Sequence, residues 1–195
     1  MGEPYKRPGW KNEKIINKEK IMSKPKGVFW DEIWKKDEQD NVYCDHVTKK
    51  CDNIIVNVAS DLLAGLMLNE PTFTGGILQH AVGEGFLVWD ISLPNPVASQ
   101  TTLNTELARL APDSIVYLDG SDNPTATITS KIRIKTTFDF LTPAALNGKF
   151  IREQGLFGGD ATSTTDSGIM IDAINHVKIF KDATIRIVRF IDLTF

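Results

Sequence analysis

The stretch Thr125–Phe140, TATITSKIRIKTTFDF, predicts a long strand of an antiparallel sheet. Side chains of a strand alternate between two faces, and here one face is apolar while the other carries threonine and basic side chains. The apolar face consists of Ile128, Ile132, Ile134, Phe138 and Phe140. The opposite face consists of Thr127, Thr129, Lys131, Arg133, Lys135 and Thr137. A strand of this kind has one face against a core and the other in water.

Shorter apolar segments on both sides of this stretch extend the prediction to the rest of the chain. Further strands are predicted at residues 77–82, 86–91, 114–118, 149–157, 168–173, 176–180 and 184–195. Helical spacing of apolar residues predicts a helix over residues 57–68 and a second, short helix over residues 102–110. We therefore expect a mainly β protein: an antiparallel β-sandwich or barrel-like body with two short helices and an extended N-terminal arm.

Residues 27–56 are predicted to form a hairpin. The first strand, Val28–Lys35, carries Trp30 and Trp34 on one face, and a polar turn at residues 37–41 leads into the return strand. The opposite face carries Phe29 and Ile33, so both faces of this strand are partly apolar. We expect the core to cover one face and a partner protein to cover Trp30 and Trp34.

The composition is that of a globular protein. The chain has 195 residues, of which 42% are hydrophobic and 24% are charged. The longest apolar run, around Leu62–Leu68, is far shorter than the roughly 20 residues of a membrane-spanning helix, and no secretory signal is visible. We expect an arm at residues 1–26 and one β-rich body at residues 27–195, with the hairpin and helix in 27–73 and the sandwich in 74–195. We expect no membrane contact.

The net charge of −3 is unevenly distributed. Residues 1–26 contain eight Lys and Arg against three Glu, a balance of +5, which leaves −8 for the rest of the chain. The arm has no dense arginine run, so we expect a protein partner rather than nucleic acid. Its apolar side chains are the predicted contacts to a neighbouring subunit: Trp10, Ile15, Ile16 and Ile21.

Two cysteines, Cys44 and Cys51, flank His46. Two free thiols, a disulfide and a metal site remain open interpretations of this spacing. A structural zinc site usually has four ligands, and only three are present here. We therefore expect no metal, and no motif in the chain predicts a cofactor.

No sequence motif of a known catalytic site is present: there is no G-x-S-x-G, no H-E-x-x-H and no P-loop. A pair of carboxylates for glycoside hydrolysis would have to come from Asp90, Glu106 and Glu153, whose spacing along the chain gives no support for such a pair. We expect that the protein is not an enzyme.

Three segments carry a resemblance to a known family. They are His80–Gly85 (HAVGEG), Leu103–Arg109 (LNTELAR) and Ile151–Asp160 (IREQGLFGGD). In this order and spacing they resemble the tail-collar and tail-fibre N-terminal type of tailed-bacteriophage virion proteins, over residues 75–195. The chain differs in its additional N-terminal region of about 70 residues and in the absence of a C-terminal shaft and receptor-binding tip, which favours a connector, baseplate, collar or head-decorating part.

The resemblance implies a structural part of a phage or prophage particle. Such a part acts by protein–protein assembly as a tail, baseplate or collar connector. It would be located in the virion, which is assembled in the host bacterial cytoplasm. Its partners would be other virion structural proteins and further copies of itself. One alternative is a capsid decoration protein on the phage head. Another is a carbohydrate-binding attachment module with Trp30, Trp34 and Trp89 as an aromatic platform.

The polar residues of the three segments also have a structural interpretation. Glu106 and Arg109 lie three residues apart, and we expect them to pair with each other or with Arg152 and Glu153. The resemblance assigns no catalytic residue to the chain.

Overall fold

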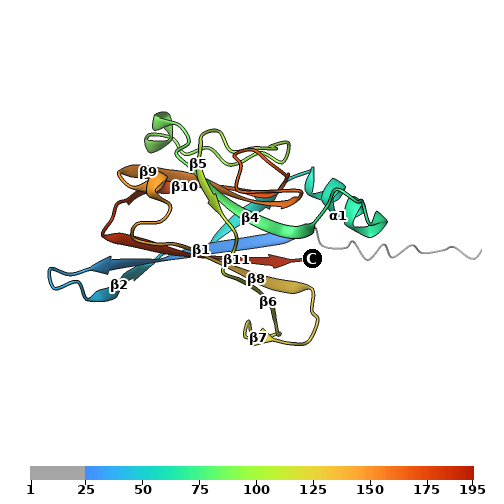
Figure 1. Cartoon of the computed structure of the whole chain (residues 1–195), viewed down its shortest axis with the longest axis horizontal. Helices are drawn as coiled ribbons and strands as arrows, with labels where there is room; N and C mark the ends of the chain where they lie inside the picture. Colours follow the sequence, from blue (N-terminus) through green and yellow to red (C-terminus); the bar gives the residue numbers. More distant parts are fainter. Residues whose placement is uncertain (1–24) are drawn as a thin grey trace, which may run out of the picture.

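The computed structural model describes residues 25–195, which form one antiparallel sheet of eleven strands with a single α-helix and two short 3-10 helices (Figure 1). The predicted mainly β, antiparallel class is confirmed. Four of the predicted contact residues, Trp10, Ile15, Ile16 and Ile21, lie outside the described residues.

The elements follow one another along the chain from β1 to β11. They are β1 (Lys26–Lys36), β2 (Val42–Val47), β3 (Cys51–Ile55), α1 (Ala59–Leu68), β4 (Gly75–Gly83), η1 (Leu87–Asp90), β5 (Glu106–Leu110), β6 (Ser114–Leu118), β7 (Pro124–Thr125), β8 (Lys131–Phe138), η2 (Ala144–Leu146), β9 (Lys149–Gly159), β10 (Ile169–Lys181) and β11 (Ile185–Thr194).

The strands lie in the order β5-β4-β9-β10-β3-β1-β11-β8-β6-β7, and β2 pairs with the free length of β1. Strand β3 joins two halves of this sheet, because Ile54 and Ile55 pair with β10 while Cys51–Asn53 pair with β1. Figure 1 shows the two halves as layers, with β9 and β10 in the upper one and β1, β11, β8 and β6 in the lower one.

The apolar core lies between these two halves. Phe29 of β1 and Ile191 of β11 belong to the same buried cluster as Leu156 of β9 and Ile174 of β10. Leu62 of α1 packs into this cluster from one end. Burial of each such side chain contributes about 1.5–3 kcal/mol to folding, so the packing of the two faces is the main source of stability.

A buried ion pair interrupts this apolar core. Arg189 of β11 donates two hydrogen bonds to the carboxylate of Asp31 of β1, at 2.5 and 2.6 Å, and both side chains are almost wholly buried. Arg189 also contacts Nε2 of His176 on β10, at 3.2 Å. Because His176 donates from Nδ1 to the carbonyl of Val177, its Nε2 is free to accept. The pair on the lower half is thereby joined to the upper half.

A second polar bridge crosses the core at His80 of β4. Its Nε2 donates to Oε1 of Gln154 on β9 at 2.7 Å, and its Nδ1 accepts from the hydroxyl of Thr136 on β8 at 2.9 Å. Burial and the nearby charge of Arg189 lower the pKa of His80 to about 3 and that of His176 to about 4. Both imidazoles are therefore neutral at neutral pH, as these hydrogen bonds require.

Asp172 on β10 is a third buried polar group. The pairing of β10 with β9 shifts by one residue between Met170 and Asp172, and the carboxylate of Asp172 accepts the backbone N–H of Leu156 at 2.7 Å. It also accepts from the side-chain amide of Asn53. Burial raises the pKa of Asp172 to about 6 despite these two donors.

Several predicted elements are wrong. Residues 102–110 do not form a second helix: 106–110 are strand β5, because pairing with β4 outweighs the helical spacing of the leucines. Residues 86–91 do not form a strand. Gly85 has a positive φ of 59°, which turns the chain, and the 3-10 helix η1 follows.

The long stretch 125–140 is extended over a shorter length than predicted. The main strand begins at Lys131, and Ile128, which was predicted to face the core, is 80% exposed. The hydroxyl of Thr129 accepts the backbone N–H of Lys131 and donates to a carbonyl, which replaces pairing along the ladder. The segments 168–173 and 176–180, predicted as two strands, form one strand, β10, whose pairing with β9 is irregular between Asn175 and Ile179.

The buried ion pair can be tested directly. Asp31→Ala leaves the Arg189 charge buried without its partner and is expected to reduce the free energy of unfolding by about 3–5 kcal/mol. The double variant Asp31→Leu/Arg189→Met, which removes both charges, is expected to lose much less. Urea denaturation measures both. A single variant no less stable than the double variant would contradict a structural role for the pair.

Asp172 makes stability depend on pH. Its pKa is higher in the folded chain, so the folded state binds more protons and the free energy of unfolding falls as the pH rises towards about 6. Relative to wild type, Asp172→Asn should therefore gain about 1.4 kcal/mol between pH 5 and pH 7.5, the value of one pH unit. His80 and His176 are common to both proteins and cancel in this difference. A difference that does not change with pH would contradict the raised pKa.

Candidate functional site

The three segments that carry the family resemblance meet in space, because β5, β4 and β9 are neighbouring strands. Glu153 on β9 lies at their meeting point and is fully buried. Its Oε1 accepts the backbone N–H groups of Gly85 and Thr105, at 3.2 and 2.7 Å. Its Oε2 accepts the backbone N–H and side-chain amide of Asn104, at 3.0 and 2.8 Å. One carboxylate thus fixes the chain after β4 and the chain before β5.

A second ion pair holds the neighbouring loop at residues 160–168. Arg109 and Glu106 form two hydrogen bonds of 2.6 Å, which confirms the expectation that they pair with each other. The pair forms on a strand and not on a helix. Residues three apart on a regular strand point to opposite faces, but a bulge in β5 opposite Val82 and Gly83 brings both side chains to the same face. Arg109 also donates to the carbonyl of Ser167 at 2.8 Å.

A third set of charges fixes η1. Arg152 of β9 donates to both oxygens of Asp90 at 2.9 and 3.1 Å, and Lys178 of β10 donates to the same carboxylate at 2.8 Å. The two cations hold the pKa of Asp90 far below its usual range. Arg152 also donates to the carbonyl of Glu84. Asp90 is therefore anchored to two strands at neutral pH.

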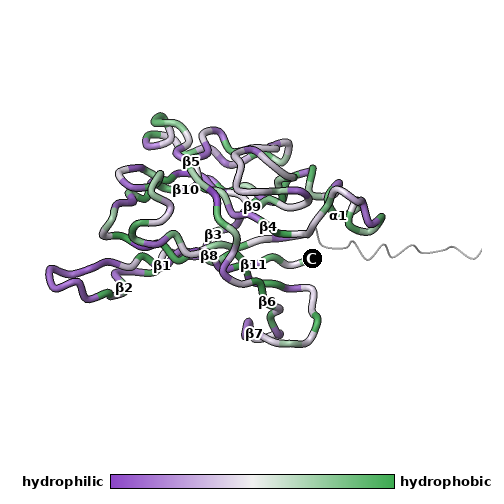
Figure 2. The backbone as a smooth tube through the Cα atoms, in the orientation of Figure 1, coloured by the Kyte–Doolittle hydropathy of each residue, from purple (hydrophilic) through white to green (hydrophobic). Residues whose placement is uncertain are grey.

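The loop that these charges hold presents apolar side chains to solvent. The Trp89 ring is buried against Gly85 and would collide with a Cβ at that position. Its neighbours point outwards: Leu87 is 75% exposed and Ile91 is 90% exposed. We define the η1 patch as the exposed apolar residues of this region: Phe86, Leu87, Val88, Ile91, Leu93 and Val177. The loop lies at the upper left of Figure 1, and Figure 2 colours part of it as hydrophobic.

A small notch opens within the η1 patch. Its volume is about 210 Å³, and its apolar lining residues are Trp89, Ile91, Leu93 and Val177. Asp90 and Lys178 form its polar edge. The notch is large enough for a side chain of a partner protein, and too small for most ligands of the size that protein pockets usually hold.

Trp30 lies on the outer face of β1, on the side away from the core. It stacks on Phe190 of β11 with 5.2 Å between ring centroids, and the guanidinium of Arg133 lies 4.9 Å from its centroid. Lys50 lies 4.3 Å from the same ring. The residues that alternate with Arg133 along β8 include no aromatic side chain on its face. Its aromatic surroundings come from Trp30 on β1 and Phe190 on β11. Asp192 pairs with Arg133, so this face is not a free basic surface.

The three tryptophans of the proposed carbohydrate platform are not brought together. Trp34 shares the outer face of β1 with Trp30 and donates to Glu32 at 3.1 Å. Trp89 belongs to η1 in the other half of the sheet, and its side chain is buried. A flat sugar-binding surface made from all three residues is therefore absent among residues 25–195.

Cys44 and Cys51 are free, exposed thiols. Cys44 pairs with Trp34 and Cys51 with Phe29, five positions apart along β1. This separation corresponds to roughly 17 Å, well beyond the Cα spacing of a disulfide. The disulfide interpretation is therefore wrong for this conformation. Within residues 25–195, no group of three or more His, Cys, Asp or Glu residues is placed to hold a metal ion.

The three carboxylates considered for catalysis all have structural partners. Glu153 accepts four hydrogen bonds from the loops, and Glu106 is held by Arg109. Asp90 has a lowered pKa, which is the opposite of what a general acid needs. Each side chain fixes a loop, and the contacts of Asp90 with Arg152 and Lys178 hold the η1 segment itself.

Comparison with protein-family models gives no match, and a search of the curated proteins gives none either. None of the helices within residues 25–195 has both the length and the apolar character of a membrane span.

Sequence reasoning missed the η1 patch because it assigned residues 86–91 to a strand, with half of the side chains inward. One signal was available: Gly83 and Gly85 precede the apolar run FLVW at 86–89, and glycine at this spacing is typical of a turn. A turn at these glycines would end the strand before residue 86 and would predict a surface loop for residues 86–91.

The loop-fixing role of Glu153 is testable. In Glu153→Gln the amide nitrogen cannot accept hydrogen bonds, so two of the four donors lose their partner. We expect a loss of about 3 kcal/mol in the free energy of unfolding and faster amide exchange at Asn104. Glu84→Gln is the control, since Glu84 only meets Lys149 at 3.9 Å near the surface. Equal stability of the two variants in urea would contradict this role.

Proposed function

We propose that the chain is a structural component of a tailed-phage or prophage-derived particle and that it acts by protein–protein assembly, as a tail, baseplate or collar connector. The observation that supports this proposal most strongly is the η1 patch. Apolar side chains are exposed there on a loop that buried and half-buried ion pairs hold in place.

A rigid apolar patch is suited to binding another protein. Soluble proteins rarely expose several large apolar side chains in one place unless another surface covers them. The hydrogen bonds of Arg152 and Lys178 to Asp90 fix the loop before any partner arrives. A loop that is ordered beforehand loses little conformational entropy on binding, so more of the burial energy contributes to affinity.

The proposed architecture is a β-sandwich made from the two halves of the sheet. In support, all three buried clusters combine side chains from more than one strand, and two of them include both halves. The three segments that resemble the tail-collar and tail-fibre type would then serve to build loops at one end of the sandwich. In agreement with this, Glu153, Arg109 and Arg152, which lie in these segments, all form hydrogen bonds to loop residues.

Two further surfaces fit an assembly role. Trp30 and Trp34 lie on the outer face of β1, where a neighbouring subunit can cover them. The arm residues Trp10, Ile15, Ile16 and Ile21 supply apolar side chains beyond the described body. Partners of this kind are other virion structural proteins or further copies of the chain.

The proposal is tested by substitution in the η1 patch. Ile91→Asp places a charge within the η1 patch at a side chain that is 90% exposed, so folding is expected to be unchanged. We expect incorporation into purified phage particles, measured by quantitative mass spectrometry, to fall by about tenfold or more.

The matched control is Ile128→Asp. Ile128 is also highly exposed but lies in the loop between β7 and β8, outside the η1 patch. It should be incorporated at the wild-type level. Normal incorporation of Ile91→Asp, or absence of the wild-type chain from every particle fraction, would refute the proposal. Recovery only with the head fraction would identify a decoration protein in place of a connector.

A further inference from the structure

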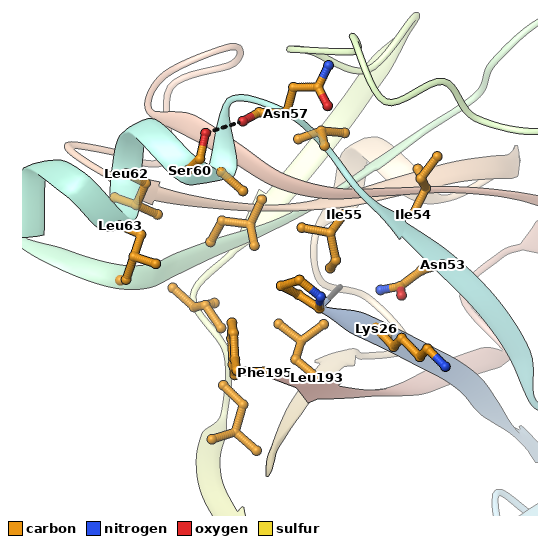
Figure 3. A pocket seen from close by; sticks show the side chains of 18 of the residues that line it. Lys26, Asn53, Ile54, Ile55, Asn57, Ser60, Leu62, Leu63, Leu193 and Phe195 are labelled. Atoms are coloured by element: carbon orange, nitrogen blue, oxygen red, sulfur yellow. Dashed lines mark hydrogen bonds between the residues drawn. The ribbon is translucent and has the colours of Figure 1, made fainter. Parts of the chain in front are cut away.

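A large apolar groove opens between the two halves of the sheet beside α1. Its volume is about 1340 Å³. Figure 3 shows side chains from three elements that border the same space: Leu62 and Leu63 of α1, Ile55 of β3, and Leu193 at the end of β11. Phe195 also borders it and is 56% exposed.

The size and chemistry of the groove favour a peptide over a small molecule. Pockets for small ligands usually measure about 300–1,000 Å³ and contain a few polar groups that orient the ligand. This groove is larger, and most of its lining side chains are aliphatic. Its polar lining residues include Lys26, Asp52 and Asn53. An extended segment with several aliphatic side chains matches such a surface.

The chain itself supplies such a segment at the edge of the groove. Pro25, Lys26 and Gly27 are lining residues, so the 24 preceding residues are tethered directly beside it. Within ten positions of Pro25 this segment contains Ile15, Ile16, Ile21 and Met22. Four residues of extended chain span roughly 13 Å, so the length of chain between Ile21 and Pro25 is sufficient for Ile21 to enter the groove.

Charge favours the same association. Residues 1–24 contain seven Lys and Arg against three Glu, a balance of +4. The total of −3 therefore leaves −7 for residues 25–195. A basic segment close to an acidic body is attracted to it, and a short tether gives the segment an effective concentration in the millimolar range. A separate copy of the chain has neither the tether nor this local concentration.

We propose that, in the free subunit, this groove binds residues 15–22 of the chain's own N-terminal arm. The apolar side chains of the arm then cover Leu63, Ile55 and Phe195. Binding of the arm in the free chain does not depend on whether the chain is a component of a phage particle. Exchange of the same segment into the groove of a neighbouring copy would be a domain swap that uses the same contacts.

The experiment is limited proteolysis of the full-length chain with trypsin, followed by intact-mass spectrometry of cleavage after Lys20. Docking protects the bond between Lys20 and Ile21, and cleavage follows the population of undocked arm. Leu63→Asp places a charge in the groove at a position that is already 55% exposed. We expect cleavage after Lys20 to become on the order of tenfold faster in this variant.

Two matched controls separate docking from general effects. Leu68→Asp lies on the same helix and is highly exposed, but it does not line the groove, so it should cleave at the wild-type rate. On the arm side, Ile21→Asp is expected to accelerate cleavage at Lys18, whereas Asn12→Asp, outside residues 15–22 and away from the cleaved bond, is not. Circular dichroism confirms that each variant is folded.

The outcomes are distinct. Equal cleavage rates in wild type, Leu63→Asp and Leu68→Asp would overturn the proposal. Protection that disappears on dilution, together with a dimer in light scattering, would overturn binding of the chain's own arm and assign the segment to a second copy. Because the measurement uses the free chain, its failure would leave the incorporation result for Ile91→Asp unaffected.

Discussion

The buried ion pair between Asp31 and Arg189 constrains the rest of the structure. A charge buried between two apolar layers is tolerated only where its partner and hydrogen bonds are in place, so β1 and β11 have one acceptable register. His176 extends this constraint to β10 in the other half, and His80 adds a second crossing to Thr136. We infer that these polar contacts specify how the two halves meet, while the aliphatic clusters provide most of the stability.

The same principle operates at the end of the molecule that carries the η1 patch. Glu153, Arg152 and Arg109 each donate or accept hydrogen bonds that fix a loop. The contacts of Arg152 with Asp90 and of Glu153 with Gly85 fix the segment that presents exposed apolar residues such as Ile91. An apolar surface held in this way is suited to contact with another protein, which is the physical basis of the assembly proposal.

Much of the β framework can be predicted from sequence alone, because apolar alternation is local. The strand at 114–118 and the helix near 57–68 are recovered, as is the hairpin of β1 and β2. Residues 102–110 are not, since the strand β5 is stabilised by pairing with a distant β4. The aromatic surroundings of Arg133 and the groove beside α1 depend on how distant strands meet. No local pattern encodes that placement, and pairing registers from related sequences or a structure are needed to find it.

The assembly proposal depends on the η1 patch being a contact surface. The most direct measurement is a cryo-electron microscopy reconstruction of a particle that contains the chain, at a resolution that shows side chains. We predict that Leu87 and Ile91 of every copy are buried against another protein, with the loop in the conformation described above. A reconstruction in which these residues face solvent in every copy would contradict the account.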